Sequence, residues 1–271
     1  MPELPEVETI RKDLAKLIIG KKILDVETSS PKQVKPSLEV VKKAVVGAKI
    51  KKVSRRAKLL QIFLDNGQIL AIHLKLTGRL LLRKKGDLFD NWQRVTIHLT
   101  ENLELRLADL RKFGWIKLVK DEKELSKILS EFGPEPMTDL DLPTFKKILK
   151  SSRRPIKIIL MDQSKISGIG NIYAVEALFL AKVDPRRPAN KLKETESKRL
   201  LVSIEKVLKA GIRYRGASDQ YYLDALGRKG NYQKHFLVYK RIGEKCFDCP
   251  GKIIRISLGG RGTFFCPHCQ K

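Results

Sequence analysis

The chain opens with Met1-Pro-Glu-Leu-Pro-Glu-Val-Glu8, and this stretch decides how its first domain begins. Apolar residues recur at helical spacing from Val7 to Ile18, so the pattern predicts a helix from about Pro5 that Gly20 ends. Prolines at a helix start and glutamates in its first turn are ordinary, because the fixed φ and the helix dipole suit them. Glutamates rather than basic residues open the sequence, so we do not expect an export signal here.

A second interpretation of the same stretch is chemical. If Met1 is removed, Pro2 presents a secondary amine with Glu3 and Glu6 close by in sequence. At about pH 7.5 roughly a third of a terminal amine is neutral, against roughly 0.1% of a lysine side chain. Such an amine needs little activation to attack a carbon atom. These eight residues alone favour the helix-start interpretation.

The first half of the chain is predicted to be mainly β-structure. Apolar or alternating segments, typical of strands, are bounded by turn residues such as Asp65-Asn66-Gly67. We expect strands at residues 23–27, 50–54, 59–64, 69–74, 79–82, 95–99, 103–107 and 115–119, with a short helix at 38–46. Together with the first helix, they indicate an antiparallel sandwich or barrel.

The second half is predicted to be mainly helical. Residues 131–143 contain three prolines and lack periodicity, so we interpret them as a linker. Helical patterns follow at residues 142–150, 154–162, 172–181 and 194–210. The fold class is therefore α+β multidomain, with expected domains at residues 1–130, 144–240 and 241–271.

The charge balance indicates a polyanionic partner. Fifty-six Lys and Arg against thirty Asp and Glu give a formal net charge of +26. Nucleic acid is the commonest partner of such a surface, whereas short basic runs can also be solvated faces. No apolar run approaches the ~20 residues of a membrane span.

Four cysteines form two pairs, Cys246-Phe-Asp-Cys249 and Cys266-Pro-His-Cys269. Two Cys-x-x-Cys turns joined by a hairpin are typical of a zinc site, although two disulfides are the alternative. Gly259-Gly260 would supply the turn between strands at 253–257 and 263–265. We expect one structural Zn²⁺, because a site with four thiolates has no open position for chemistry.

In combination, these features resemble the bacterial formamidopyrimidine-DNA glycosylases. The resemblance covers nearly the whole chain and is carried by residues 2–9, 72–74, 109–114, 168–174, the cysteine module and residues 260–264. It implies an N-terminal β-sandwich domain (1–130), a linker (131–143), a helix-two-turn-helix DNA-binding domain (144–240) and a zinc ribbon (241–271).

The resemblance implies a mechanism as well. Pro2 matches the N-terminal proline whose amine attacks C1′ of the damaged nucleotide, giving an imine and then β- and δ-elimination. Glu3 matches the general acid and base, and Glu6 a second acidic position that holds the site together. Lys58 matches a lysine that contacts the DNA backbone and assists the reaction.

Several DNA contacts are also implied by the resemblance. His73, Lys157, Asn171 and Arg261 match backbone-contacting positions, although His73 by type alone would be a half-buried imidazole. Arg111 and Phe113 match two of three side chains that fill the gap left by the extruded base. Leu76 stands where the family usually has Met, and Leu110 and Lys112 also depart from the usual Pro and Arg.

Residues 216–239 match a mobile loop that covers the extruded base, although their tyrosines could equally pack against the zinc ribbon. The resemblance implies a base-excision repair enzyme that removes 8-oxoguanine and formamidopyrimidines from double-stranded DNA. Two alternatives remain: an endonuclease VIII-like glycosylase for oxidised pyrimidines, and a non-enzymatic zinc-ribbon nucleic-acid-binding protein. We further expect a monomer, located in the bacterial cytoplasm with the nucleoid.

Overall fold

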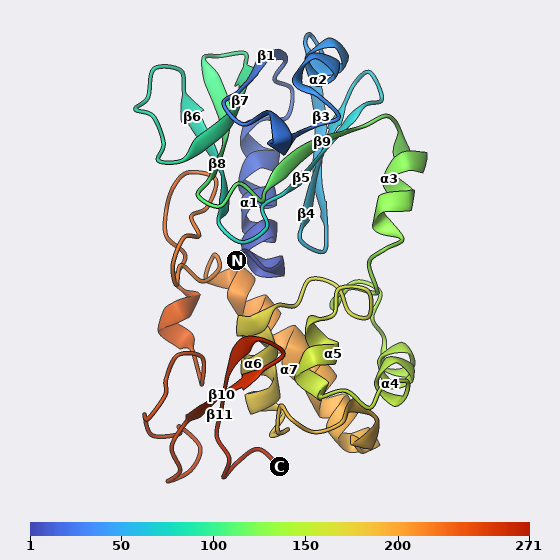
Figure 1. The fold of residues 1–271 in the computed structure, drawn as a ribbon, viewed down its shortest axis with the longest axis vertical. Coiled ribbons are helices and arrows are strands. Elements are labelled where there is room, and N and C mark those ends of the chain that lie inside the picture. Colours follow the sequence, from blue (N-terminus) through green and yellow to red (C-terminus); the bar gives the residue numbers. More distant parts are fainter. The chain divides into compact units, whose positions relative to one another are not determined.

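The computed structural model describes all residues from 1 to 271, which fold as two compact units (Figure 1). The first unit comprises Met1–Ser130 and Tyr214–Gln233, and the second comprises Glu131–Arg213 and Lys234–Lys271. We expected residues 214–233 within the helical domain, whereas they pack with the first unit. No helix combines the length and apolar character that crossing a membrane requires.

The first unit is a β-sandwich with a helix at its start, as the sequence predicts. Helix α1 (Leu4–Leu17) turns Val7, Ile10 and Leu14 inward, and they join a core to which both sheets contribute. The four-stranded sheet has the order β1-β7-β8-β6, with β1 (Ile23–Thr28), β7 (Gln93–Leu99), β8 (Leu103–Asp109) and β6 (Gly78–Lys84). The five-stranded sheet has the order β2-β9-β5-β4-β3, with β2 (Val34–Lys35), β9 (Trp115–Val119), β5 (Ile69–His73), β4 (Leu59–Leu64) and β3 (Ile50–Arg56).

Nearly all strand pairs are antiparallel. Their register places several of the candidate site residues at one end of each sheet. Leu59 lies opposite His73, which in turn lies opposite Trp115. Gly78 lies opposite Asp109 in the other sheet. The first unit also contains η1 (Pro31–Gln33), α2 (Leu38–Val45) and α3 (Glu122–Leu129).

Helix α3 was not predicted, although its signal is in the sequence. Asp121 accepts a hydrogen bond from the Glu124 nitrogen at 2.7 Å, and Lys120 N donates to the Glu124 side chain. This Asp-x-x-Glu pattern is a helix-start signal, and Leu125 supplies the buried contact.

The second unit is helical and carries a two-stranded ribbon. Helix α6 is apolar on every side, so it is almost completely buried, and α7 packs along it (Figure 1). The helices are α4 (Leu142–Lys150), α5 (Ile156–Met161), α6 (Asn171–Leu180) and α7 (Glu194–Arg213), with short turns η2 (Ala189–Lys191) and η3 (Tyr232–His235), the latter beginning in the first unit. Strands β10 (Ile254–Leu258) and β11 (Arg261–Phe265) form the ribbon, which packs on α6 through Val175 and Phe179.

Candidate active site and nucleic-acid interface

Pro2 and Glu3 lie buried at the start of α1, while Met1 is exposed. Glu3 is the N-cap of the helix and forms a capping box with Glu6, whose Oε2 accepts from the Glu3 nitrogen at 2.8 Å. The helix therefore fixes the peptide that follows Pro2. With Met1 attached, the Pro2 nitrogen is part of an amide and is not nucleophilic, so the amine exists only after Met1 is removed.

Glu6 joins the helix start to the segment of residues 214–233, which we call the 214–233 segment. Its second carboxylate oxygen, Oε1, accepts from Ala217 N at 2.8 Å. The Tyr222 hydroxyl donates to the Glu6 carbonyl at 3.4 Å, and burial raises the pKa of Tyr222 well above its usual value. Gly216 has φ +82°, and a Cβ there would lie 2.8 Å from Glu6 Cγ, so only glycine fits.

A buried carboxylate organises the second half of this segment. Asp224 accepts hydrogen bonds from the Arg215 and Arg228 side chains and from the Leu226 and Arg228 nitrogens. Burial alone raises the pKa of Asp224, but the bonds from Arg215 and Arg228 hold it below its usual range. Arg215 also pairs with Asp13 of α1 at 2.5 Å, so the 214–233 segment is attached to the helix at Asp13 as well as at Glu6.

Lys58 and His73 lie together where β4 and β5 pair. Lys58 is 5% exposed and follows Ala57, whose positive φ marks the turn between β3 and β4. Burial, followed by the charges of Lys75 and Lys58, lowers the pKa of His73 to about 3. His73 Nδ1 accepts from the Lys75 nitrogen at 2.9 Å. The imidazole is therefore neutral and carries its proton on Nε2.

The three predicted gap-filling side chains lie on two turns that share one carboxylate. Asp109 is fully buried and accepts from Thr77 Oγ1 at 2.5 Å, Arg111 N at 3.2 Å and Gly114 N at 2.7 Å. Thr77 follows Leu76 in the β5–β6 turn, and its hydroxyl also accepts from Arg111 N at 3.1 Å. The buried carboxylate thus brings the turn of Leu76 to the loop of Arg111 and Phe113.

These side chains are available at the surface. Phe113 is 50% exposed, Arg111 is exposed, and its guanidinium lies 4.6 Å from the centre of the Phe113 ring. Leu76 is partly exposed. An exposed aromatic ring with a guanidinium over its face can insert between bases, because apolar side chains at a surface can separate base steps.

In the second unit, Lys157, Asn171 and Arg261 gather around the tip of the ribbon. Asn171, the first residue of α6, donates from Nδ2 to the Gly262 carbonyl at 3.1 Å, and its Oδ1 is buried without a hydrogen-bond partner. Gly259 and Gly260 form the hairpin turn with positive φ, and Arg261 beside them is exposed. Lys157 is fully buried, and its ammonium donates to Thr263 Oγ1 at 2.7 Å. It therefore supports the ribbon tip in this structure, while Arg261 faces solvent.

The four cysteines fit a zinc ion. Their sulfur atoms all lie within 4.8 Å of one another, with Cys246 to Cys269 at 3.7 Å and Cys249 to Cys266 at 3.6 Å. Zn–S bonds of about 2.3 Å in a tetrahedron place sulfurs about 3.8 Å apart, whereas a disulfide requires about 2.05 Å. The geometry excludes the two-disulfide alternative and fits one Zn²⁺. Asp248 N and Gly251 N also point to cysteine sulfurs, as around a bound metal.

The tyrosines of residues 216–239 divide between the two units. Tyr222 joins the core of the first unit, and Tyr221 contacts Trp92. Tyr239 packs against Phe264 of the ribbon, beside Glu176, whose buried carboxylate accepts from three successive backbone nitrogens of residues 237–239. The roles of Asp109, Asp224 and Glu176 could not be predicted from the sequence, since nothing local shows that a given carboxylate is buried.

Comparison with known proteins assigns a family to each part of the chain. Residues 1–116 match the formamidopyrimidine-DNA glycosylase N-terminal domain, residues 132–222 the H2TH domain of the same enzymes, and residues 243–271 the zinc finger found in FPG and IleRS. The formamidopyrimidine-DNA glycosylase of Carboxydothermus hydrogenoformans is 42% identical over 273 residues and is covered completely, as is this chain.

Solved structures of a Lactococcus lactis relative agree with this assignment. Its complex with abasic-site DNA has a TM-score of 0.94 at 37% identity, covering 99% of both chains. A second complex contains DNA with N7-benzyl-Fapy-dG, and has a TM-score of 0.94 at 37% identity over 100% of both chains.

Proposed function

Because this chain belongs to the formamidopyrimidine-DNA glycosylase family, we propose that it excises 8-oxoguanine and formamidopyrimidines from double-stranded DNA and then cuts the strand. It is a base-excision repair DNA glycosylase with the lyase activity of that family. One observation carries the catalytic assignment: Pro2 and Glu3 are held at a buried helix start by Glu6, which also holds the 214–233 segment.

The reaction begins once Met1 has been removed. The Pro2 amine attacks C1′ of the damaged nucleotide, a C–N bond forms, and the bond from C1′ to the base breaks. The base leaves with the bonding electrons and takes up a proton. Glu3 acts as general acid at the sugar ring oxygen while the ring opens to an imine, and as general base in later proton transfers.

The imine then promotes strand cleavage. Loss of a C2′ proton expels the 3′ phosphate in β-elimination, and δ-elimination expels the 5′ phosphate. Lys58, placed beside His73 where its charge lowers the pKa of that imidazole, contacts the DNA backbone at the reacting nucleotide. His73 is neutral, so it donates a hydrogen bond to a phosphate from Nε2 and adds no charge.

The remaining site residues bind and distort the duplex. Leu76, Arg111 and Phe113 fill the gap left by the extruded base, and leucine, like methionine, is an apolar side chain that can separate base steps. Asn171 and Arg261 contact phosphates from the second unit, supported by Lys157 beneath the ribbon tip. The zinc ion, bound by all four cysteines, holds the ribbon in its fold. Since genomic DNA is the substrate, the enzyme acts at the bacterial nucleoid.

Product analysis on two duplexes tests this proposal. One contains 8-oxoguanine opposite C and the other contains thymine glycol opposite A. We expect the first to yield a one-nucleotide gap with phosphates at both ends, and the second to react much more slowly. A preference for thymine glycol would refute the purine assignment and support the endonuclease VIII-like alternative.

A further inference from the structure

Arg79 of β6 contacts the 214–233 segment at a point that the proposed mechanism does not use. Its Nε donates to the Tyr221 carbonyl at 2.5 Å, and its guanidinium lies 5.4 Å from the centre of the Trp92 ring. The Trp92 and Tyr221 rings meet edge to face, with centres 6.2 Å apart. All three side chains are half-buried. Arg79 thus contacts the Tyr221 carbonyl and Trp92 contacts the Tyr221 ring, and we call these two residues the clamp.

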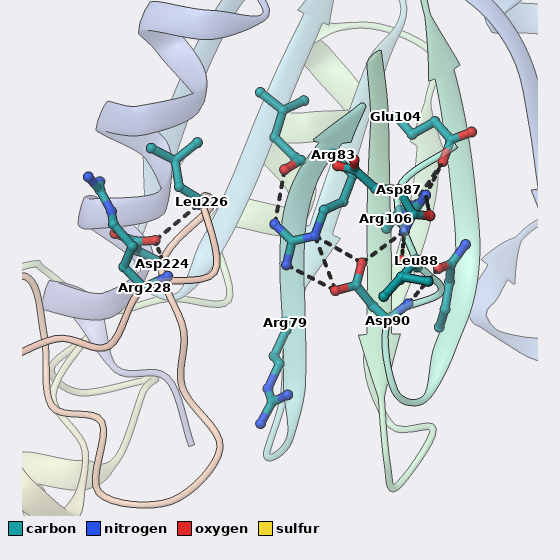
Figure 2. A network of polar contacts seen from close by, with 12 residues as sticks. Arg79, Arg83, Asp87, Leu88, Asp90, Glu104, Arg106, Asp224, Leu226 and Arg228 are labelled. Atoms are coloured by element: carbon teal, nitrogen blue, oxygen red, sulfur yellow. Dashed lines mark hydrogen bonds and ion pairs between the residues drawn. The ribbon is translucent and has the colours of Figure 1, made fainter. Parts of the chain in front are cut away.

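The clamp lies between two fixed ends of the segment. At one end Ala217 donates to Glu6, and at the other the Leu82 nitrogen of β6 donates to the Ala225 carbonyl at 2.7 Å. Figure 2 shows Asp224 with Leu226 and Arg228 beside this second end. Residues 218–223 thus form a span that is attached at both ends and held in the middle by Arg79.

The base of the clamp is rigid. Figure 2 shows Arg79 on the same strand as Arg83, whose side chain pairs with Asp90 at 2.9 Å. Asp90 also accepts from the buried Arg106, and these pairs fix the loop that leads from β6 to Trp92. Strand β6 and Trp92 are therefore a fixed support, and the 218–223 span is the part that they hold.

Trp92 also connects the clamp to the gap-filling loop. The Asp109 nitrogen donates to the Trp92 carbonyl at 2.8 Å, and the Asp109 carboxylate organises the turns of Leu76 and Arg111. Trp92 thus contacts both Asp109, which organises the gap-filling side chains, and Tyr221 of the 214–233 segment. A shift of Tyr221 would also move its neighbour Tyr222, whose hydroxyl donates to the Glu6 carbonyl at 3.4 Å. These residues lie in the segment that matches the family's loop over the extruded base.

Resting on the proposed function, we propose that Arg79 and Trp92 are positioning residues that hold the 214–233 segment against the extruded base. They therefore act in the step that depends on the base, and not in the elimination that follows. Neither side chain touches the reacting atoms. An abasic site has no base to hold, so its cleavage does not need the clamp.

The test compares single-turnover cleavage of two duplexes, one with 8-oxoguanine opposite C and one with a preformed abasic site. In Arg79→Ala and Trp92→Leu we expect excision of 8-oxoguanine to fall about 10- to 100-fold, because a charged hydrogen bond and a cation–π contact are lost. Abasic-site cleavage should change by less than about threefold. Trp92→Phe keeps an aromatic ring and should stay close to the wild type.

Lys84→Ala is the matched control, because it removes one positive charge from the same strand at an exposed position. Equal losses on both duplexes would show a general folding defect and overturn the proposal, as would unchanged excision in both Arg79→Ala and Trp92→Leu. A wild-type protein that cleaves neither duplex would instead contradict the proposed function.

Discussion

Replacing Asp109 by Asn tests whether one buried carboxylate assembles the gap-filling side chains. The carboxylate accepts from Thr77 and Arg111 through Oδ1 and from Gly114 through Oδ2. An amide has one acceptor oxygen, so the arrangement with the smallest loss keeps Oδ1 and turns an NH₂ group towards the Gly114 N–H. One charged hydrogen bond is lost and a buried N–H is left unsatisfied. We expect the free energy of unfolding to fall by about 2 to 4 kcal/mol.

The functional consequence concerns base extrusion. Without the Gly114 bond and the negative charge, the loop that carries Arg111 and Phe113 is held less firmly beside the turn of Leu76. Single-turnover excision of 8-oxoguanine from a paired duplex should fall about 10- to 100-fold, and much less when the lesion lies in an unpaired bubble, because a bubble needs no wedge.

Urea denaturation and the two cleavage rates measure these effects. Asp65→Asn is the matched control, since Asp65 is exposed and accepts from the Lys49 nitrogen alone among the described bonds. It should change the unfolding free energy by less than about 1 kcal/mol. Asp109 would not assemble these side chains if Asp109→Asn unfolded within about 0.5 kcal/mol of the wild type and excised the paired lesion at the wild-type rate.

Three further changes test other parts of the site. Glu6→Gln leaves one acceptor for the nitrogens of Glu3 and Ala217, so urea denaturation should show a loss of about 1.5 to 3 kcal/mol; unchanged stability would contradict the bridging role. The pKa of His73 is about 3 in the folded protein, below its ordinary 6.5. The contribution of the neutral imidazole to the free energy of unfolding is therefore complete above pH 6.5. It is lost as the pH falls towards 3, by at most ~1.4 kcal/mol per pH unit. The free energy of unfolding of His73→Gln, measured between pH 4 and 7, should lack this dependence on pH. Equal slopes in the variant and the wild type would argue against a buried neutral imidazole. Removing zinc with a chelator, or Cys249→Ser, should unfold the ribbon and weaken DNA binding, because Arg261 loses its support; a zinc-free protein that binds DNA with full affinity would exclude that role.

Local patterns predicted the elements of this fold well. The bounds expected for β4, β9 and α4 agree with the structure, because each has a periodic apolar pattern between clear turn or cap residues. The zinc site followed from the spacing of its cysteines, and the sulfur positions confirm it. The alternatives of two disulfides and of a non-enzymatic binding protein are wrong, in view of the sulfur distances and the family.

Contacts between distant residues could not be predicted in the same way. Glu6 and Ala217 are separated by 211 positions, and no property of either residue indicates the other. The sequence therefore predicts the 214–233 segment within the helical domain, although it packs on α1 and β6. Lys157 likewise matches a backbone-contacting position of the family, whereas its ammonium is buried against Thr263.

We propose that the amine of Pro2 attacks the sugar after Met1 is removed. Intact-mass measurement of the N-terminus, combined with borohydride reduction in the presence of DNA containing 8-oxoguanine, tests it most directly. We expect a protein lacking Met1 to form a covalent adduct with the DNA at Pro2, and both Pro2→Gly and a form that retains Met1 to show reduced or no adduct. A protein that lacks Met1 and forms no adduct, or an adduct at another residue, would contradict the account.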